Sequence, residues 1–195
     1  DQQRPFSMMD RLELLGVEGH GSFTHHELFF ISTPLNTLPL ALWGIPWQKV
    51  PHKGGNMPIP QTTPDKAKMI LDEDPKAIYL DVRSIPEFTQ GHAAGAINIP
   101  LMHFTNGQML PNPDFPMVAG SALEKDKTYV VGCKMGGRSQ KACEILERLG
   151  FRKIFNIHGG FGGAPDQPGW KDLGLPTSTD NGPGVSYESL SAKAK

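Results

Sequence analysis

One segment indicates the fold of this chain most directly: Val130-Val131-Gly132-Cys133-Lys134-Met135-Gly136-Gly137-Arg138-Ser139. An apolar, β-type run ends in a cysteine, a short loop with two glycines follows, and an arginine opens a helix-like segment. A strand that passes through a tight loop into a helix is the unit of α/β folds. The loop between the two elements is also the most informative place in the chain for chemistry.

The cysteine of this stretch is placed where a thiol can ionise. Unpaired amides and the positive end of a helix dipole both favour a thiolate at the position of Cys133. Gly136 and Gly137 let the backbone curl so that successive N–H groups point inward as an anion nest. Lys134 and Arg138 add fixed positive charge. We therefore predict a nucleophilic sulfur that faces loop amides and is open to solvent.

Short apolar segments alternate with helical patterns around this loop. The expected strands cover 77–81, 96–99, 127–131 and 153–157, and the expected helices start at 64 and 85 and cover 138–149. This alternation predicts an α/β fold with a mainly parallel central sheet and helices on both faces. Because sites in such sheets lie beyond the carboxyl ends of the strands, Asp81 and Cys133 are expected at one edge.

The first 60 residues differ from the rest of the chain. We expect an irregular, proline-rich, apolar N-terminal arm at 1–60, the α/β domain at 61–176 and a polar C-terminal tail at 177–195. The stretch 28–48 has no charged residue and reaches the ~20 residues needed to span a bilayer. Its internal prolines argue against a spanning helix. The arm is expected either to pack on its own domain or to cover an apolar partner or membrane surface, anchored by Trp43 and Trp47.

Composition excludes several functional classes. The net charge is −1 and no basic run interrupts the sequence, so nothing indicates nucleic-acid binding. Two cysteines, Cys133 and Cys143, cannot form a disulfide framework and favour a reducing compartment, either cytoplasm or an organelle interior such as a mitochondrial matrix or a plastid. The histidines at 20, 25 and 26 have no cysteine among them, so we predict no metal site.

Four segments in register resemble the rhodanese family of sulfurtransferases over residues 63–176. They are Tyr79-Leu80-Asp81-Val82-Arg83 with Glu87 and Gly91-His92; Gly95-Ala96-Ile97-Asn98-Ile99-Pro100; Cys133-Lys134-Met135-Gly136-Gly137-Arg138-Ser139, which matches a C-x-x-G-x-R loop; and Gly159-Gly160-Phe161 with Trp170 and Gly174-Leu175-Pro176. The resemblance implies a single rhodanese-like domain. It adds the family's sulfur-transfer chemistry to the reactive thiol that the loop residues already indicate.

The resemblance implies a role for each loop residue. Cys133 would take a sulfane sulfur from thiosulfate or a similar anionic donor, become a persulfide, and pass the sulfur to cyanide, a thiol or a protein. The amides from Lys134 to Ser139 (Lys134, Met135, Gly136, Gly137, Arg138 and Ser139) would cradle the persulfide. Lys134 and Arg138 would draw in and orient the donor. No metal or organic cofactor is needed for this chemistry.

Two further classes of function stay open. Four residues separate Cys133 from Arg138, whereas the related cell-cycle phosphatases have five and carry a histidine at the position of Gly132. The shorter loop favours sulfur transfer over phosphatase or arsenate reductase chemistry. The apolar arm instead suggests an accessory subunit of a larger complex, at a membrane or elsewhere, which docks through residues 1–60.

Several other residues have a structural and a functional interpretation. Asp81 and Arg83 are expected to tie a strand end to nearby loops, and would also support the active pocket. Cys143 lies inside a helix, where packing is favoured over a role as resolving thiol. We expect His92 to be a structural hydrogen-bonding residue and Trp170 to pack in the core or at its rim. His158 is expected at a surface turn. Met135 is expected to form an apolar loop tip that helps an acceptor dock.

Overall fold

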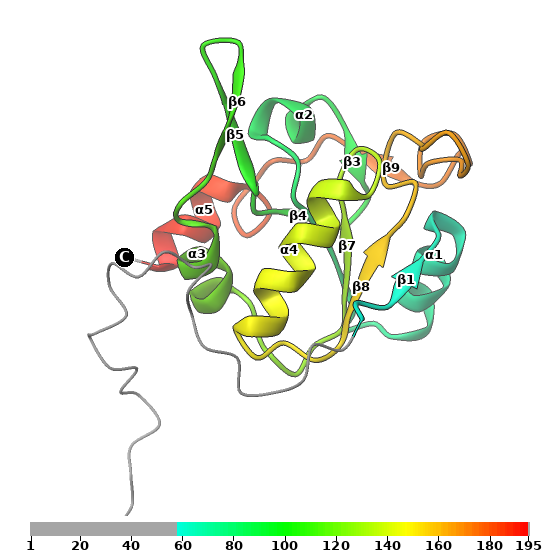
Figure 1. Cartoon of the computed structure of the whole chain (residues 1–195), viewed down its shortest axis with the longest axis horizontal. Coiled ribbons are helices and arrows are strands. Elements are labelled where there is room, and N and C mark those ends of the chain that lie inside the picture. The colour runs from blue at the N-terminus through cyan, green and yellow to red at the C-terminus, as the bar shows by residue number, and fades with distance from the viewer. Residues whose placement is uncertain (1–57, 195) are drawn as a thin grey trace, which may run out of the picture. The chain divides into compact units, whose positions relative to one another are not determined.

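A computed structural model describes residues 58–194 of the chain (Figure 1). The expected N-terminal arm, apart from its last three residues, lies outside this range. So do its charge-free stretch, Trp43 and Trp47, and the histidines at 20, 25 and 26. Among the described residues, no helix has both the length and the apolar character needed to cross a bilayer.

The centre of the domain is a five-stranded sheet in which every neighbouring pair is parallel. In spatial order its strands are β1 (Gln61–Thr62), β8 (Ile154–Ile157), β7 (Tyr129–Gly132), β2 (Ile78–Asp81) and β4 (Ile97–Asn98). The three central strands are largely buried, as expected for a parallel sheet with both faces covered. The prediction of a mainly parallel α/β sheet is confirmed.

Helices cover both faces of this sheet. They are α1 (Pro64–Glu73), α2 (Ile85–Thr89), α3 (Phe115–Ala122), α4 (Gly137–Arg148) and α5 (Tyr187–Ser191), the last followed by a 3-10 turn at Ala192–Ala194. Ala67 of α1 packs in one core cluster with Tyr79, Val130 and Trp170. Helix α4 packs against β7 and β8 with buried residues that are not members of that cluster, and it therefore covers the opposite face.

Two small antiparallel sheets were not predicted. Strand β3 (His92–Ala93) pairs with β9 (Thr177–Ser178), and β5 (Met102–Thr105) pairs with β6 (Gln108–Pro111) in a hairpin that projects from the domain (Figure 1). The hairpin turns at Asn106-Gly107, both with positive φ. Asn-Gly between short β-type segments is a strong hairpin signal, and the sequence contained it.

The C-terminal segment is more ordered than the expected polar tail. Strand β9 pairs with β3, and α5 packs on α3. Leu190 of α5 is only 3% exposed. Val185 also packs against the core and Tyr187 contacts His103. So few apolar residues in a mostly polar stretch carry little signal in a sequence.

The register of the sheet places the functional candidates. Asp81 pairs with Gly132, the last residue of β7, so Asp81 and Cys133 emerge at the same end of adjacent strands. Asp81 is the last residue of β2 and Cys133 directly follows β7, so both lie at the carboxyl ends of parallel strands, where sites are expected.

We expect Leu190→Ala to lower the free energy of unfolding by about 2–4 kcal/mol, because it leaves a cavity where a buried leucine packs. Urea unfolding followed by circular dichroism measures the change. Leu173→Ala is the matched control, since Leu173 is 40% exposed and its truncation is expected to cost less than about 0.5 kcal/mol. Equal small effects for both variants would mean that the C-terminal segment does not stabilise the domain.

Candidate active site

Cys133 lies directly after β7, and its sulfur is enclosed by the loop that leads into α4. The backbone N–H of Gly136 donates to Cys133 Sγ at 3.1 Å, and the Ser139 hydroxyl lies 3.4 Å from the same sulfur. Gly136, the N-cap of α4, has a φ of +119°, which glycine adopts without strain. The sulfur therefore sits at the start of a helix in contact with one of its loop amides.

A second glycine-rich segment holds this loop in shape. The amides of Phe161, Gly162 and Gly159 donate to the carbonyls of Cys133, Lys134 and Met135 at 2.8, 2.8 and 3.1 Å, respectively. A side chain at Gly160, which has a φ of +51°, would collide with the Cys133 carbonyl. Only a glycine lets the two backbones approach this closely.

These three bonds determine where the loop amides point. In a trans peptide the carbonyl and the following N–H point in opposite directions, and no peptide in the described chain is cis. Carbonyls that point toward residues 159–162 therefore turn the amides of residues 134–136 to the other side. The Gly136 bond to Sγ is the direct observation of this, and it confirms the prediction that a loop N–H faces the thiol.

The sulfur of Cys133 is less accessible to solvent than the sequence predicted. Cys133 is only 2% exposed, whereas Met135 at the loop tip is 47% exposed. The thiol is covered because Gly136 and the buried Ser139 side chain close around it. A reaction partner must therefore bring an unhindered, terminal atom to the sulfur.

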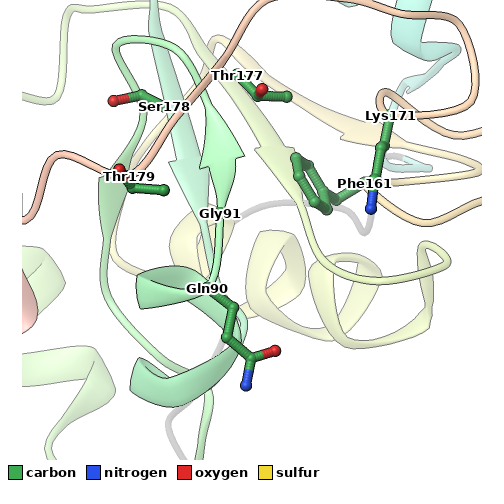
Figure 2. Close-up of a pocket in the computed structure, with 7 residues that line it drawn as sticks. All are labelled: Gln90, Gly91, Phe161, Lys171, Thr177, Ser178 and Thr179. Atoms are coloured by element: carbon green, nitrogen blue, oxygen red, sulfur yellow. The ribbon is translucent and has the colours of Figure 1, made fainter.

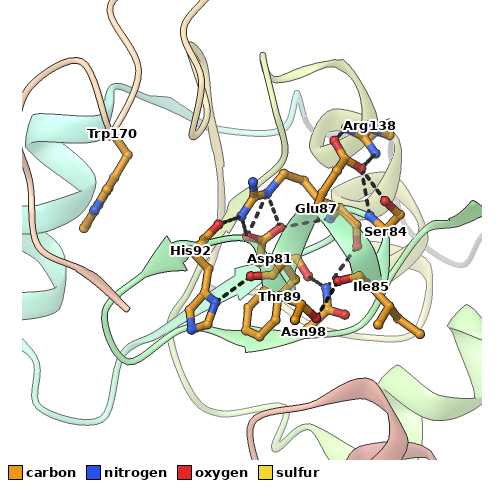
Figure 3. Close-up of polar contacts among 12 residues, drawn as sticks. Asp81, Ser84, Ile85, Glu87, Thr89, His92, Asn98, Arg138 and Trp170 are labelled. Atoms are coloured by element: carbon orange, nitrogen blue, oxygen red, sulfur yellow. Dashed lines mark hydrogen bonds and ion pairs between the residues drawn. The ribbon is translucent and has the colours of Figure 1, made fainter. Parts of the chain in front are cut away.

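Arg138 is bound to Glu87 of α2 rather than free beside the thiol. Its guanidinium makes two parallel hydrogen bonds to the Glu87 carboxylate, at 2.7 and 2.8 Å (Figure 3). Glu87 also accepts from the backbone N–H and hydroxyl of Ser84, in a capping box at the start of α2. The pair fastens α2 to the N-terminus of α4.

The charge state of Glu87 follows from these contacts. Burial alone would raise the pKa of Glu87, but hydrogen bonds from Arg138 and Ser84 lower the pKa from 4.5 to about 2. The resemblance implied that Arg138 orients an anionic donor, yet two of its N–H groups are already bound to a carboxylate. The Ser84-x-x-Glu87 spacing is a capping-box signal in the sequence that points to Glu87.

Asp81 and Arg83 form a second, more deeply buried ion pair. Arg83 Nη2 lies 2.7 Å from Asp81 Oδ2 and also donates to the carbonyl of Gly91. The side chain of Asn98 donates to the backbone carbonyls of both Asp81 and Arg83 (Figure 3). The guanidinium of Arg83 stacks 4.1 Å from the ring centre of Phe161. This network ties the end of β2 to neighbouring loops, which confirms the structural part of the expectation for these residues.

The comparison with known families agrees with this geometry. The rhodanese-like domain family matches residues 63–163, more than half of the chain. The chain belongs to the rhodanese-like domain family. The matched segment contains the Cys133 loop, the Asp81–Arg83 pair and the glycines that brace the loop.

Several relatives of this rhodanese-like domain are plant proteins. It is 43% identical over 99 residues to "Thiosulfate sulfurtransferase 16, chloroplastic" of Arabidopsis thaliana, an alignment that covers 51% of this chain and 78% of the relative. It is 36% identical to "Thiosulfate sulfurtransferase 18" of the same plant, over 52% of this chain and 72% of the relative. "Protein HIGH ARSENIC CONTENT 1, mitochondrial" is 38% identical, and the chain covers 54% of its length.

Solved structures confirm the fold. A crystal structure of an M. tuberculosis protein matches with a TM-score of 0.55 at 22% identity, covering 64% of this chain and 100% of that chain. A solution structure of a rhodanese-like domain from Anabaena sp. matches with a TM-score of 0.50 at 26% identity, covering 62% of this chain and 80% of that domain.

The other singled-out residues of the rhodanese-like domain are structural. Cys143 is fully buried in α4, and burial raises the pKa of its thiol far above the usual range, so it is held as a neutral thiol. Trp170 is buried against Tyr79 and donates to the Pro176 carbonyl. His92 stacks on Phe88 and bonds to its carbonyl, and His158 pairs with Asp166 at the surface. Residues 58–194 contain no group of side chains that could hold a metal ion.

We expect Glu87→Gln to destabilise the domain by about 1–2 kcal/mol at pH 7, because Arg138 loses its charged partner. The figure allows for the partial exposure of the pair. Since folding lowers the pKa of Glu87, its contribution is complete above pH 4.5 and disappears as the pH falls toward 2. The gap in stability between wild type and variant, followed by urea unfolding from pH 7 to pH 2, should narrow below pH 4.5.

Glu144→Gln is the control for this prediction. Glu144 pairs with Lys141 on the exposed side of α4, where both side chains are at least one-third accessible. Exposed pairs contribute little, so the control should change stability by less than about 0.5 kcal/mol. A gap between wild type and Glu87→Gln that did not depend on pH would contradict the ion-pair explanation.

We expect Gly160→Ala to loosen the thiol loop, because its methyl group displaces the Cys133 carbonyl. Hydrogen exchange of the Gly136 amide, measured by NMR, should accelerate at least tenfold. Gly174→Ala is the matched control: Gly174 has a φ of +64° but open space around it, so it carries the backbone strain alone. Similar exchange at Gly136 in both variants would show that the close approach at Gly160 does not hold the loop.

Proposed function

We propose that this protein is a sulfurtransferase that carries a sulfane sulfur on Cys133 as a persulfide. The proposal is supported by the Gly136 N–H, which donates to Cys133 Sγ. The carbonyls of residues 133–135 are bound to the 159–162 segment and so point away from the sulfur. A fixed N–H dipole stabilises negative charge on a sulfur without needing to reorganise during the reaction. The sulfurtransferase names of two plant relatives support the same chemistry.

In the first step, the Cys133 thiolate attacks the terminal sulfur of an anionic donor such as thiosulfate. A new S–S bond forms, the donor's own S–S bond breaks, and sulfite leaves with the bonding electron pair. The terminal sulfur of thiosulfate is unhindered, which suits a thiol that is only 2% exposed. With Arg138 occupied by Glu87, we assign attraction of the donor to Lys134, whose ammonium has no ion pair within residues 58–194.

In the second step, a thiophilic acceptor takes the sulfur. A thiolate or cyanide attacks the outer atom of the persulfide, the bond between that atom and Sγ breaks, and Cys133 leaves as a thiolate. The amides turned inward by the 159–162 segment would stabilise this thiolate as they stabilised the persulfide. The cycle needs no oxidant and no cofactor.

Arsenate reductase activity is the second candidate, and the relative named for arsenic content is its motive. Four residues between Cys133 and Arg138 make a small loop, in which the Gly136 amide is already in contact with Sγ. A tetrahedral oxyanion needs more room around the sulfur than one additional sulfur atom does. Sulfur transfer is therefore the better fit.

Two of the relatives also bear on the compartment in which the protein acts. The chloroplastic and mitochondrial relatives favour an organelle interior, a plastid or a mitochondrial matrix. We also propose that residues 1–60 dock the protein onto a larger assembly. Deletion of those residues should abolish that assembly without changing sulfur loading of Cys133.

Intact-mass spectrometry tests the proposed function. Incubation with thiosulfate should add the mass of one sulfur atom to the wild type, and cyanide should remove it. Cys133→Ser should show no adduct, because the nucleophile is gone. Cys143→Ser is the matched control and should load like the wild type, since its thiol is buried and neutral. Loading that survives Cys133→Ser, or a wild type that never loads while folded, would refute the proposal.

A further inference from the structure

The segment that braces the thiol loop has a single side chain of its own. Its residues are Gly159, Gly160, Phe161, Gly162 and Gly163, and glycine leaves the backbone more freedom than any other residue. Its amides hold the loop carbonyls, but bonds between two loops do not by themselves fix either loop to the sheet. Phe161 is therefore the residue through which side-chain packing can hold the segment in place.

The ring of Phe161 makes two kinds of contact. It packs against the core cluster that contains Tyr79 and Trp170, and the guanidinium carbon of Arg83 lies 4.1 Å from the centre of the ring. A cation at that distance from an aromatic face is attracted to it, and the attraction is stronger where water is excluded. Arg83 is only 5% exposed, so this contact belongs to the stronger kind.

Arg83 is itself fixed in position. Its Nε and Nη2 make three hydrogen bonds to the Asp81 carboxylate, at 3.1, 3.0 and 2.7 Å, and Nη2 also donates to the Gly91 carbonyl at 2.8 Å. Bonds in the plane of a guanidinium leave its face free to stack on a ring. Asp81 ends β2 and pairs with Gly132, the residue before Cys133. The ring is thereby tied to the strand ends that carry the site.

We propose that Phe161 is a positioning residue for Cys133 and that Arg83 holds it in that role, an inference that rests on the proposed function. The backbone N–H of Phe161 donates to the Cys133 carbonyl at 2.8 Å, so a displaced ring shifts the peptide plane that follows the cysteine. The Gly136 N–H then loses its alignment with Sγ. Phe161 acts through the loop backbone rather than on the reacting atoms.

The test replaces the aromatic face at position 161 in the full-length protein. Phe161→Leu keeps an apolar side chain but offers Arg83 no face, whereas Phe161→Tyr keeps the ring. A pocket of about 300 Å³ adjoins Phe161 and Gly91 (Figure 2), which leaves room beside the ring for the added hydroxyl.

The rate of persulfide formation, followed by mass spectrometry at several thiosulfate concentrations, measures the effect. Phe161→Leu should lower the limiting rate about tenfold and change the half-saturating concentration less than about twofold, because it misplaces the nucleophile without removing a contact to the donor. Phe161→Met, a second variant without a ring, should behave like Phe161→Leu. Phe161→Tyr should stay within about twofold of the wild type in both quantities.

Leu190→Ala is the control for lost stability, since it weakens the packing of α5 on α3. Measured below the unfolding transition of every variant, its limiting rate should stay within about twofold of the wild type. An equal loss of rate in Leu190→Ala and Phe161→Leu would attribute the effect to stability and overturn the positioning role. A loss in Phe161→Tyr as large as that in Phe161→Leu would overturn it as well.

Hydrogen exchange separates this inference from the proposed function, because it needs no sulfur transfer. The Gly136 amide should exchange about tenfold faster in Phe161→Leu than in the wild type, and at close to the wild-type rate in Phe161→Tyr. That pattern in a protein that never forms a persulfide would support the positioning role and refute the sulfurtransferase proposal. Persulfide formation with unchanged Gly136 exchange in Phe161→Leu would overturn the positioning role alone.

Discussion

The hydrogen bonds between the 159–162 segment and the thiol loop are the constraint on which the site depends. Three loop carbonyls are bound on one side, so the peptide planes between residues 133 and 136 have no freedom to rotate. The amides of these peptides then point away from the 159–162 segment, and that of Gly136 donates to the sulfur. A loop of this length without such bracing would have many conformations, and conformational entropy would oppose the one that encloses an anion.

The charges near the loop depend on which side chains form ion pairs as well as on where those side chains lie. The loop has two cations by sequence, but Arg138 is bound in a fork to Glu87 and stabilises the junction of α2 and α4. Arg83 is likewise bound to Asp81. Guanidinium groups suit such bidentate pairs, and both arginines near the loop are engaged in this way.

Much of the domain could be predicted because its signals are local. Buried parallel strands appear as short apolar runs, and α4 shows an apolar stripe that ends at Gly150, so the central sheet and its main helix were expected within a few residues. The β5–β6 hairpin, the β3–β9 pair, α3 and α5 were missed. The hairpin's signal was one Asn-Gly pair, and α5 depends on tertiary packing, such as that of Leu190, which no local pattern reveals.

The sequence alone determined that a cysteine lies between a buried strand and a helix, in a glycine-rich loop that belongs to the rhodanese-like family. Chain order is sufficient for this because strand, loop and helix are consecutive. Only the tertiary structure decided which partners those residues have: Glu87 for Arg138, residues 159–162 for the loop carbonyls, and near-complete burial for the thiol. These contacts join segments far apart in the chain, and their geometry exists only once the sheet has brought the segments together.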